Sequence, residues 1–312
     1  MCLIAFAIGC SARWPLVVAA NRDEYFDRPT SPLARWTSPV GQTLISGRDL
    51  RAGGAWFGIT PDGRVAFVTN VRERPAAARP RSRGELVTRW LESRGDAAEF
   101  LSDLSLSNGA AGDDGEFAGF NLVVGDLARQ RWSWITNRSA TAASGSSWQT
   151  RKLTTGVYGL SNAQLDTPWP KTERIKQALK AALEADAAGA SSSHGAPASP
   201  GSSEANCSLK ARLWAALADH QPGAPPLQPG IPRPATREDA LSSAFVNWPE
   251  GGYGTCSSAL LTAEALPVDS SLKPAVHSLR VSMRERQRGS LQTTGEEVFQ
   301  LAVTDWPVAP DV

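Results

Sequence analysis

The chain has 312 residues, and its hydrophobic content of 41% is sufficient to bury a sizeable core. Lys and Arg number 32 against 31 Asp and Glu, so the formal net charge of +1 provides no field that would attract nucleic acid or an anionic membrane. The cysteines Cys2, Cys10, Cys207 and Cys256 are widely spaced and form no C-x-x-C pair, which indicates reduced thiols in the cytoplasm and no structural zinc site.

The first predicted elements are two short apolar runs, "CLIAFAIG" at residues 2–9 and "PLVVAA" at residues 15–20. Two such runs with a tight connection predict a β-hairpin that is buried on both faces. A turn near Ala12 places Cys2 directly opposite Arg22. The polar stretch "NRDEYFDRP" therefore reaches the same end of the sheet as the cysteine.

The N-terminal run is not expected to be a targeting segment. No Lys or Arg precedes it, as a signal peptide would require, and it is far shorter than the ~20 apolar residues of a membrane span. "FAIGC" resembles a lipoprotein cleavage box that ends at Cys10, but very few residues precede it. We expect a cytoplasmic protein with no membrane span.

Further hairpins follow in chain order. "AWFGI" and "VAFVTNV" flank the turn "TPDGR" and predict a second hairpin that ends at Asn70. "FNLVVGD" and "RWSWIT" predict a third hairpin, and "GVYGLSN" predicts a strand that ends at Asn162. A helix around residues 85–93 is predicted by apolar residues at helical spacing, namely Leu86, Val87, Trp90 and Leu91.

The second half begins with the amphipathic sequence "KTERIKQALKAALEA", which predicts a helix started by Pro-Lys-Thr. Residues 187–206 are rich in Ala, Ser, Gly and Pro, which predicts a mobile insertion that cannot pack a core. A helix around 209–217 and strands near 257–261 and 277–283 complete the expected elements.

Hairpins with helices clustered between them predict an α+β layered fold and a single domain over residues 1–312. The chain lacks G-x-G-x-x-G, G-x-x-x-x-G-K-[ST] and H-E-x-x-H, so a nucleotide fold and the common metal sites are not expected. Of the three histidines, His194 lies in the predicted insertion, and His220 and His277 are not near a nucleophile signature. This pattern favours a thiol that is activated without histidine.

Removal of Met1 would give Cys2 both a thiol and a free α-amine with a pKa of about 7.7–8.0. Such an amine can accept the proton of a thiol whose pKa is about 8.5, so one residue can supply both nucleophile and base. Arg22 would stabilise the thiolate, and Asp23 would hold the amine or the arginine. Alternatively, Cys2 is a packed strand residue with the methionine retained, and the charged residues form a surface ion-pair cluster.

An oxyanion hole would complete this site. Asn70 and Asn162 each end an apolar strand, as "VTN" and "LSN", and their side-chain amides are suitable donors to an oxyanion. Alternatively, both asparagines only form turns at the strand ends. The basic run "RERPAAARPRSRG" is expected to be a solvated loop, or else a contact for a phosphate group or an acidic partner.

Met1-Cys2, the hairpin and "ANRDEYFDRPT" resemble the NRDE family, also called the transport and Golgi organisation protein 2 family, which is named after Asn21-Arg22-Asp23-Glu24. Further blocks occur in family order: "GRDLRAGGAWFGIT", "VTNVRE", "SRGELV", "VYGLSNAQLDTPWPKT" and "YGTCSSALL". That family is similar to N-terminal nucleophile hydrolases, which implies a four-layer αββα sandwich of two antiparallel sheets.

The resemblance also implies roles for individual residues. Cys2 would be the nucleophile, and the other catalytic candidates are Asn21, Arg22, Asp23, Asn70 and Asn162. The candidate substrate-binding residues are Glu24, Trp56, Trp169, Tyr253 and Cys256. The family usually has an arginine after "YGT", where this chain has Cys256.

Two functions from different classes follow from the resemblance. One is hydrolysis of a linear amide or thioester by Cys2, with no cofactor required. The other is non-catalytic binding and trafficking of haem, an acyl chain or acyl-CoA in the same cleft, with a small-molecule acyl or porphyrin ligand as the partner. For haem, the Cys2 thiolate is a candidate axial ligand, although the chain has no Cys-Pro pair and few histidines. The oligomeric state stays open.

Overall fold

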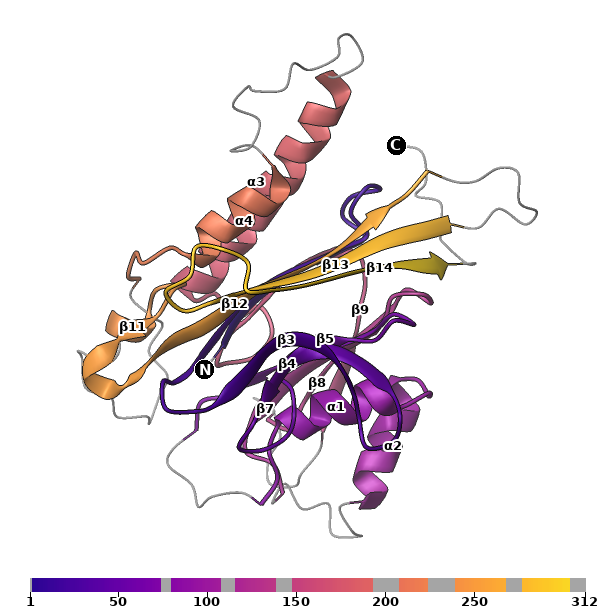
Figure 1. Ribbon diagram of the computed structural model, residues 1–312, viewed down its shortest axis with the longest axis vertical. Helices are drawn as coiled ribbons and strands as arrows, with labels where there is room; N and C mark the ends of the chain where they lie inside the picture. Colours follow the sequence, from indigo (N-terminus) through magenta and orange to yellow (C-terminus); the bar gives the residue numbers. More distant parts are fainter. Residues whose placement is uncertain are drawn as a thin grey trace.

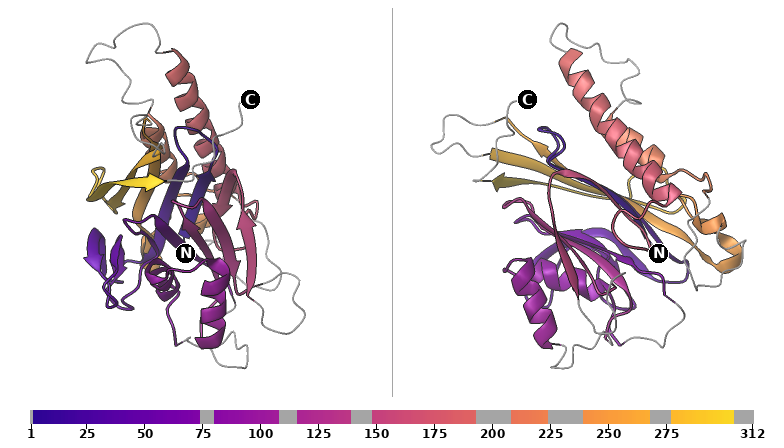
Figure 2. Two further views of the ribbon diagram at one scale, coloured as in Figure 1. Left: turned by 90° about the vertical axis from the view of Figure 1, so that its right-hand side faces the viewer. Right: turned by 180° about the vertical axis from the view of Figure 1, so that it is seen from behind.

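The computed structural model describes residues 2–73, 80–107, 116–138, 148–192, 208–223, 239–267 and 277–303. Figure 1 shows four layers: a helix layer, two β-sheets packed face to face, and a second helix layer. Figure 2 shows the same layers from behind. This is the αββα sandwich of two antiparallel sheets that the family resemblance implies, and the predicted α+β class is confirmed.

The first sheet has the strand order β10-β1-β2-β12-β13-β14, with β11 paired to β12. Its strands are β1 (Cys2–Ile8), β2 (Leu16–Tyr25), β10 (Gly156–Leu160), β11 (Asn247–Trp248), β12 (Tyr253–Ala265), β13 (His277–Gln287) and β14 (Gly295–Val303). All neighbouring pairs are antiparallel.

The second sheet has the order β3-β4-β5-β6-β7-β8-β9. Its strands are β3 (Thr30–Thr37), β4 (Thr43–Asp49), β5 (Phe57–Ile59), β6 (Arg64–Asn70), β7 (Phe120–Asp126), β8 (Arg131–Thr136) and β9 (Gln149–Leu153). The helices are α1 (Gly84–Glu92), α2 (Ala97–Ser107), α3 (Pro170–Ser192) and α4 (Leu209–Leu217), together with the 3₁₀ turn η2 (Pro249–Gly251).

Successive side chains of β1 and β2 point alternately into two separate hydrophobic layers. Ile4 and Phe6 face the second sheet, whereas Leu3 and Ala5 face helices α3 and α4. Phe6 joins the two sheets, since its ring lies 5.1 Å from that of Phe67 on β6 in an edge-to-face contact. A third buried cluster packs α1 and α2 on the outer face of the second sheet.

The three predicted hairpins and the helices near residues 85–93 and 209–217 are confirmed. Strands β3, β9 and β14 were not predicted, because they are sheet edges with exposed polar residues in place of an apolar run. Helix α3 continues through Ser192, so residues 187–192 of the predicted insertion are helical, and residues 193–206 lie outside the described ranges. Within those ranges, no helix combines the length and apolarity needed to cross a membrane.

Candidate active site

The N-terminal hairpin places Cys2 beside Arg22. The two residues are direct partners in the β1–β2 register, as predicted from the two apolar runs. Direct antiparallel partners point to the same face of a sheet, and here that face is the one that carries Ile4 and Ala20 into the core between the sheets. Cys2 is 7% exposed, so its thiol lies at the edge of this core.

A pocket of about 100 Å³ opens next to Cys2, and we call it the Cys2 pocket. One wall comes from the ends of β1 and β2, and the other from the second sheet and the start of α1. Six of the predicted site residues line it: Cys2, Arg22, Asp23, Glu24, Trp56 and Asn70. The other lining residues are Arg28, Asp49, Ala55, Val68, Ser82, Arg83 and Gly84. The structure therefore brings the cysteine, the charged motif and one asparagine together.

Asn21 lies on the other face of β2 and does not line the Cys2 pocket. Its Nδ2 donates to the carbonyl oxygens of Leu217 and Ala244, both at 2.8 Å, and its Oδ1 accepts the Ser258 hydroxyl at 2.6 Å. These bonds join the first sheet to the chain around α4. The contacts of Asn21 are those of a structural anchor.

Asp23 lies between the two faces. It lines the Cys2 pocket, its Oδ1 accepts the Thr255 hydroxyl at 2.7 Å, and its backbone carbonyl accepts the Tyr253 hydroxyl at 2.8 Å. Burial raises the pKa of the Asp23 carboxyl, while the nearby Lys171 ammonium opposes that rise. Lys171 is thus part of the electrostatic environment of the motif, which the sequence reasoning missed.

The pKa of the Cys2 thiol is also shifted from its ordinary value. Burial raises its pKa, the Asp23 carboxylate raises it further, and the Arg22 guanidinium lowers it. Burial therefore favours the neutral thiol in the intact chain, and formation of a thiolate needs a base close to the sulfur.

The two predicted asparagines lie next to each other at the ends of β6 and β10. Asn162 Nδ2 donates to the backbone carbonyl of Asn70 at 3.0 Å, and the Asn162 carbonyl accepts the Arg72 N–H at 2.8 Å. Asn162 is fully buried and does not line the Cys2 pocket, whereas Asn70 does. Of the pair, Asn70 is the one placed to act as a donor in the pocket.

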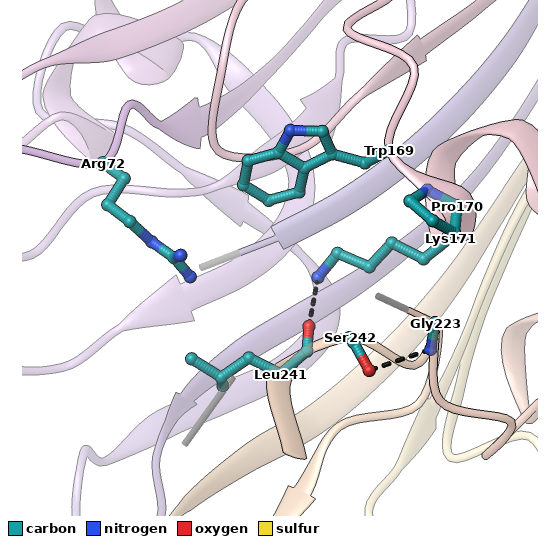
Figure 3. A pocket seen from close by; sticks show the side chains of 7 residues that line it. All are labelled: Arg72, Trp169, Pro170, Lys171, Gly223, Leu241 and Ser242. Carbon is teal, nitrogen blue, oxygen red and sulfur yellow. Dashed lines mark hydrogen bonds between the residues drawn. The ribbon is translucent and has the colours of Figure 1, made fainter. Parts of the chain in front are cut away.

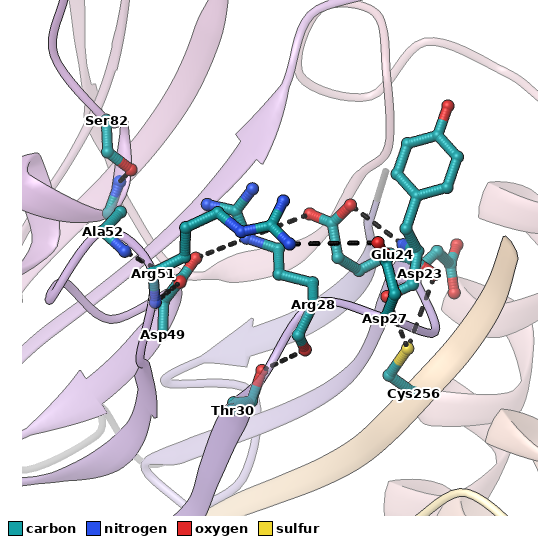
Figure 4. Close-up of polar contacts among 12 residues, drawn as sticks. Asp23, Glu24, Asp27, Arg28, Thr30, Asp49, Arg51, Ala52, Ser82 and Cys256 are labelled. Atoms are coloured by element: carbon teal, nitrogen blue, oxygen red, sulfur yellow. Dashed lines mark hydrogen bonds and ion pairs between the residues drawn. The ribbon is translucent and has the colours of Figure 1, made fainter.

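A charged network borders the pocket on the side of Glu24 (Figure 4). Arg28 Nε lies 2.7 Å from Asp49 Oδ2 and 4.0 Å from Glu24 Oε2, so two carboxylates share one guanidinium. Burial opposes ionisation of Asp49, but hydrogen bonds from the Ala52 N–H, Arg28 and the Arg51 N–H lower its pKa overall. The Asp49 carboxyl is therefore ionised near neutral pH.

Two other predicted substrate-binding residues, Tyr253 and Cys256, lie on β12 behind this network and do not line the pocket. Cys256 is the extra residue of a β-bulge between Thr255 and Ser257, and its Sγ lies 3.5 Å from the Glu24 carbonyl oxygen. Burial raises the pKa of the Cys256 thiol, while Arg22 lowers it.

Trp169 lines a different, smaller pocket with Arg72, Lys171 and Leu241 (Figure 3). The Arg72 guanidinium lies 5.6 Å from the ring centroid, and Lys171 Nζ donates to the Leu241 carbonyl at 2.9 Å. Trp169 is thus separate from the Cys2 pocket.

Arg83 is a pocket residue that the sequence reasoning missed, although it belongs to the quoted block "SRGELV". It occupies the N-cap position of α1. A close backbone approach brings this helix start to the pocket, because a Cβ on Gly54 would lie only 2.5 Å from the carbonyl carbon of Gly84. Gly54 and Gly84 therefore allow α1 to dock against the loop after β4.

The family model described as Transport and Golgi organisation 2 matches residues 1–266. The human "Transport and Golgi organization protein 2 homolog" is 33% identical over 194 residues, which is 59% of this chain and 65% of the human protein. The Drosophila melanogaster "Transport and Golgi organization protein 2" is 26% identical over 198 residues, which is 59% of this chain and 66% of that protein. The chain thus spans less than two thirds of the length of these relatives.

Two solved structures are similar at low sequence identity. The Caenorhabditis elegans N-acylethanolamine-hydrolyzing acid amidase ortholog has a TM-score of 0.41 and 13% identity, and the match covers 57% of this chain and 78% of that chain. The C2A mutant of the conjugated bile acid hydrolase from Clostridium perfringens has a TM-score of 0.45 and 7% identity, with 96% of each chain covered.

Proposed function

The chain belongs to the Transport and Golgi organisation 2 family, and from the geometry of its Cys2 pocket we propose that it hydrolyses a linear amide or thioester after removal of Met1. The observation that carries this proposal is the direct pairing of Cys2 with Arg22 in a pocket that Asp23 and Asn70 also line. These groups match the needs of acyl transfer: a nucleophile, a cation beside it, a carboxylate and an amide donor.

The chemistry would begin at the new N-terminus. The α-amine of Cys2 takes the thiol proton, and Sγ forms a bond to the acyl carbon while Asn70 donates to the developing oxyanion. The C–N or C–S bond of the substrate then breaks, and the ammonium returns its proton to the leaving amine or thiol. Water hydrolyses the thioester on Cys2 and releases the carboxylic acid.

The raised pKa of the buried Cys2 thiol supports the same scheme. A neutral thiol is a poor nucleophile, so the chain with Met1 would be inactive until the α-amine is exposed. Asp23 would stabilise the ammonium that forms once the α-amine has accepted the thiol proton, since its carboxylate lies in the same pocket. Met1 removal is therefore the activating step of the proposal.

The second candidate is an acyl-chain carrier that uses the pocket without turnover, and the apolar wall of Trp56 and Val68 favours it. A porphyrin is a poorer fit than an acyl chain. The pocket encloses about 100 Å³, below the roughly 300–1,000 Å³ of common ligand sites.

The test is the intact mass of the purified protein before and after treatment with iodoacetamide. We expect loss of one methionine, and alkylation of Cys2 that disappears in the Cys2→Ala variant. The Cys10→Ala variant is the matched control, because Cys10 is exposed, unlike the other cysteines in the described ranges. A variant with a non-removable N-terminal extension should lose the fast alkylation. Retained methionine with an inert Cys2 would overturn the hydrolase proposal and leave the carrier.

A further inference from the structure

Three arginines line the Cys2 pocket, but they are not equally neutralised. Arg28 is shared by the carboxylates of Glu24 and Asp49. Asp23, the third carboxylate of the lining, accepts its hydrogen bond from Thr255 and interacts with the Lys171 ammonium. Arg22 and Arg83 lie next to Cys2 and form no ion pair among the described residues. The carboxylates that act on them, Glu285 on Arg22 and Glu24 and Glu73 on Arg83, do so at longer range.

Arg22 is the more unusual of the two. Its residue is only 5% exposed, yet within the described part of the chain its guanidinium has no hydrogen bond and no carboxylate at ion-pair distance. The buried Glu285 carboxyl interacts with Arg22, but not at ion-pair distance. A mostly buried guanidinium without an ion-pair partner is costly, because it loses much of its hydration. A side chain of this kind that lines a pocket indicates that an anion enters there.

Arg83 points to the same conclusion. Its Nη1 donates to the Gly119 carbonyl at 3.2 Å, and among the described residues it forms no ion pair. It is close enough to Cys2 for the two groups to interact electrostatically. Ser82 and Gly84 line the pocket beside it, so the N-terminus of α1, with its partial positive charge, also faces this space.

The opposite wall is apolar. Trp56 is half-buried and packs against the core clusters, and Val68 and Ala55 complete the surface that the pocket shares with the second sheet. A ligand that fills the pocket would therefore place an apolar portion against Trp56 and a negatively charged group between the two arginines.

We propose that Arg22 and Arg83 bind a carboxylate or phosphate group of the ligand, and that Arg83 is the residue that selects anionic acyl compounds. This inference rests on the proposed function for the reaction at Cys2, but the anion site itself does not require turnover. A guanidinium is suited to the task because it offers parallel N–H donors to two oxygens of either group.

The test uses isothermal calorimetry on the Cys2→Ala variant, so that thiol chemistry cannot contribute. The probes are octanoate, octyl phosphate and octanol, which share a chain and differ in charge. We expect at least one anion to bind about tenfold or more tightly than octanol. The preferred anion identifies a carboxylate or a phosphate as the group that is bound.

Adding Arg83→Met should abolish this preference while the affinity for octanol is kept. Arg51→Met is the matched control, since Arg51 is exposed, lies on the neighbouring loop and does not line the pocket. Equal affinity for anions and octanol, or a preference that survives Arg83→Met, overturns the anion site. Anion binding together with an inert Cys2 would retain the anion site and overturn the hydrolase.

Discussion

The two faces of strand β2 carry polar side chains that are bonded very differently. On the face toward α4, Asn21 is fully buried and its amide makes three hydrogen bonds. On the face toward the second sheet, Arg22 is almost as buried, but within the described residues its guanidinium has no such bond. Two consecutive buried residues of one motif thus differ in hydrogen bonding: the Asn21 side chain is fully bonded, and the Arg22 side chain is not.

This difference in hydrogen bonding distinguishes residues that stabilise the fold from residues that can bind a ligand. A polar group that is satisfied internally has no capacity left for a ligand, whereas an unsatisfied one retains it at a cost in stability. Asp23 is intermediate, since it is anchored by Thr255 and also lines the pocket. In this motif Asn21 stabilises the fold and Arg22 is available to bind a ligand. Measurements of unfolding free energy on variants of the two residues can distinguish these roles.

The largest effect is expected at Asn21. Asn21→Leu keeps the side-chain volume but leaves the carbonyls of Leu217 and Ala244 without their donor in a buried layer. Each such loss costs about 1–3 kcal/mol, so the free energy of unfolding should fall by about 3 kcal/mol. Urea denaturation measures it. Asn70→Leu, in the pocket, is the control and should cost less than about 1 kcal/mol. Equal losses would contradict the comparison.

A smaller, pH-dependent effect is expected at Asp23. Burial raises the pKa of its carboxyl in the folded protein above the ordinary value of about 3.9, despite the opposing Lys171. Between these two values the unfolded chain binds fewer protons, so the contribution of Asp23 to stability is complete below pH 3.9 or so and declines as the pH rises through the folded pKa.

Asp23→Asn removes this proton and keeps an oxygen that can accept the Thr255 hydroxyl. The variant should show a flatter decline of unfolding free energy with rising pH than the wild type. Denaturation curves at several pH values measure the difference. Parallel pH profiles for the two proteins would show that Asp23 does not titrate in this way.

The hairpin end of the site was predictable because it depends on local pattern. Two apolar runs and one tight connection fix the register, and the register alone places Cys2 opposite Arg22. The same alternation places Asn21 on the other face of β2, yet treating the motif as one catalytic unit obscured this. The position of Asn21 away from the pocket could have been predicted, because successive side chains of a strand point to opposite faces of the sheet.

The opposite wall of the pocket could not be predicted in this way. Arg83 reaches the site because α1 docks on the loop after β4, through a backbone contact between Gly54 and Gly84. Such a contact joins segments that are far apart in the sequence, and the spacing of apolar residues along the chain does not predict it. Lys171 is similar, since only the packing of α3 on the first sheet brings it to Asp23.

The smallest change in stability is expected at Arg22. Arg22→Met replaces a buried guanidinium that has no internal partner in the described ranges with an apolar side chain of similar length. No hydrogen bond is lost and a desolvation cost is removed, so unfolding free energy should change by less than about 1 kcal/mol, toward greater stability.

Arg64 provides the matched control, because it is 4% exposed but fully engaged. Its guanidinium donates to the carbonyls of Trp90 and Gly95 and to the Ser93 hydroxyl, and it stacks 3.8 Å from the Trp90 ring centroid. Arg64→Met should therefore cost about 2–3 kcal/mol. If Arg22→Met costs as much, then Arg22 has a structural partner and has no capacity left for an anion. If only Arg64→Met is costly, two arginines of equal burial differ because one is bonded to the fold and the other is kept for a ligand.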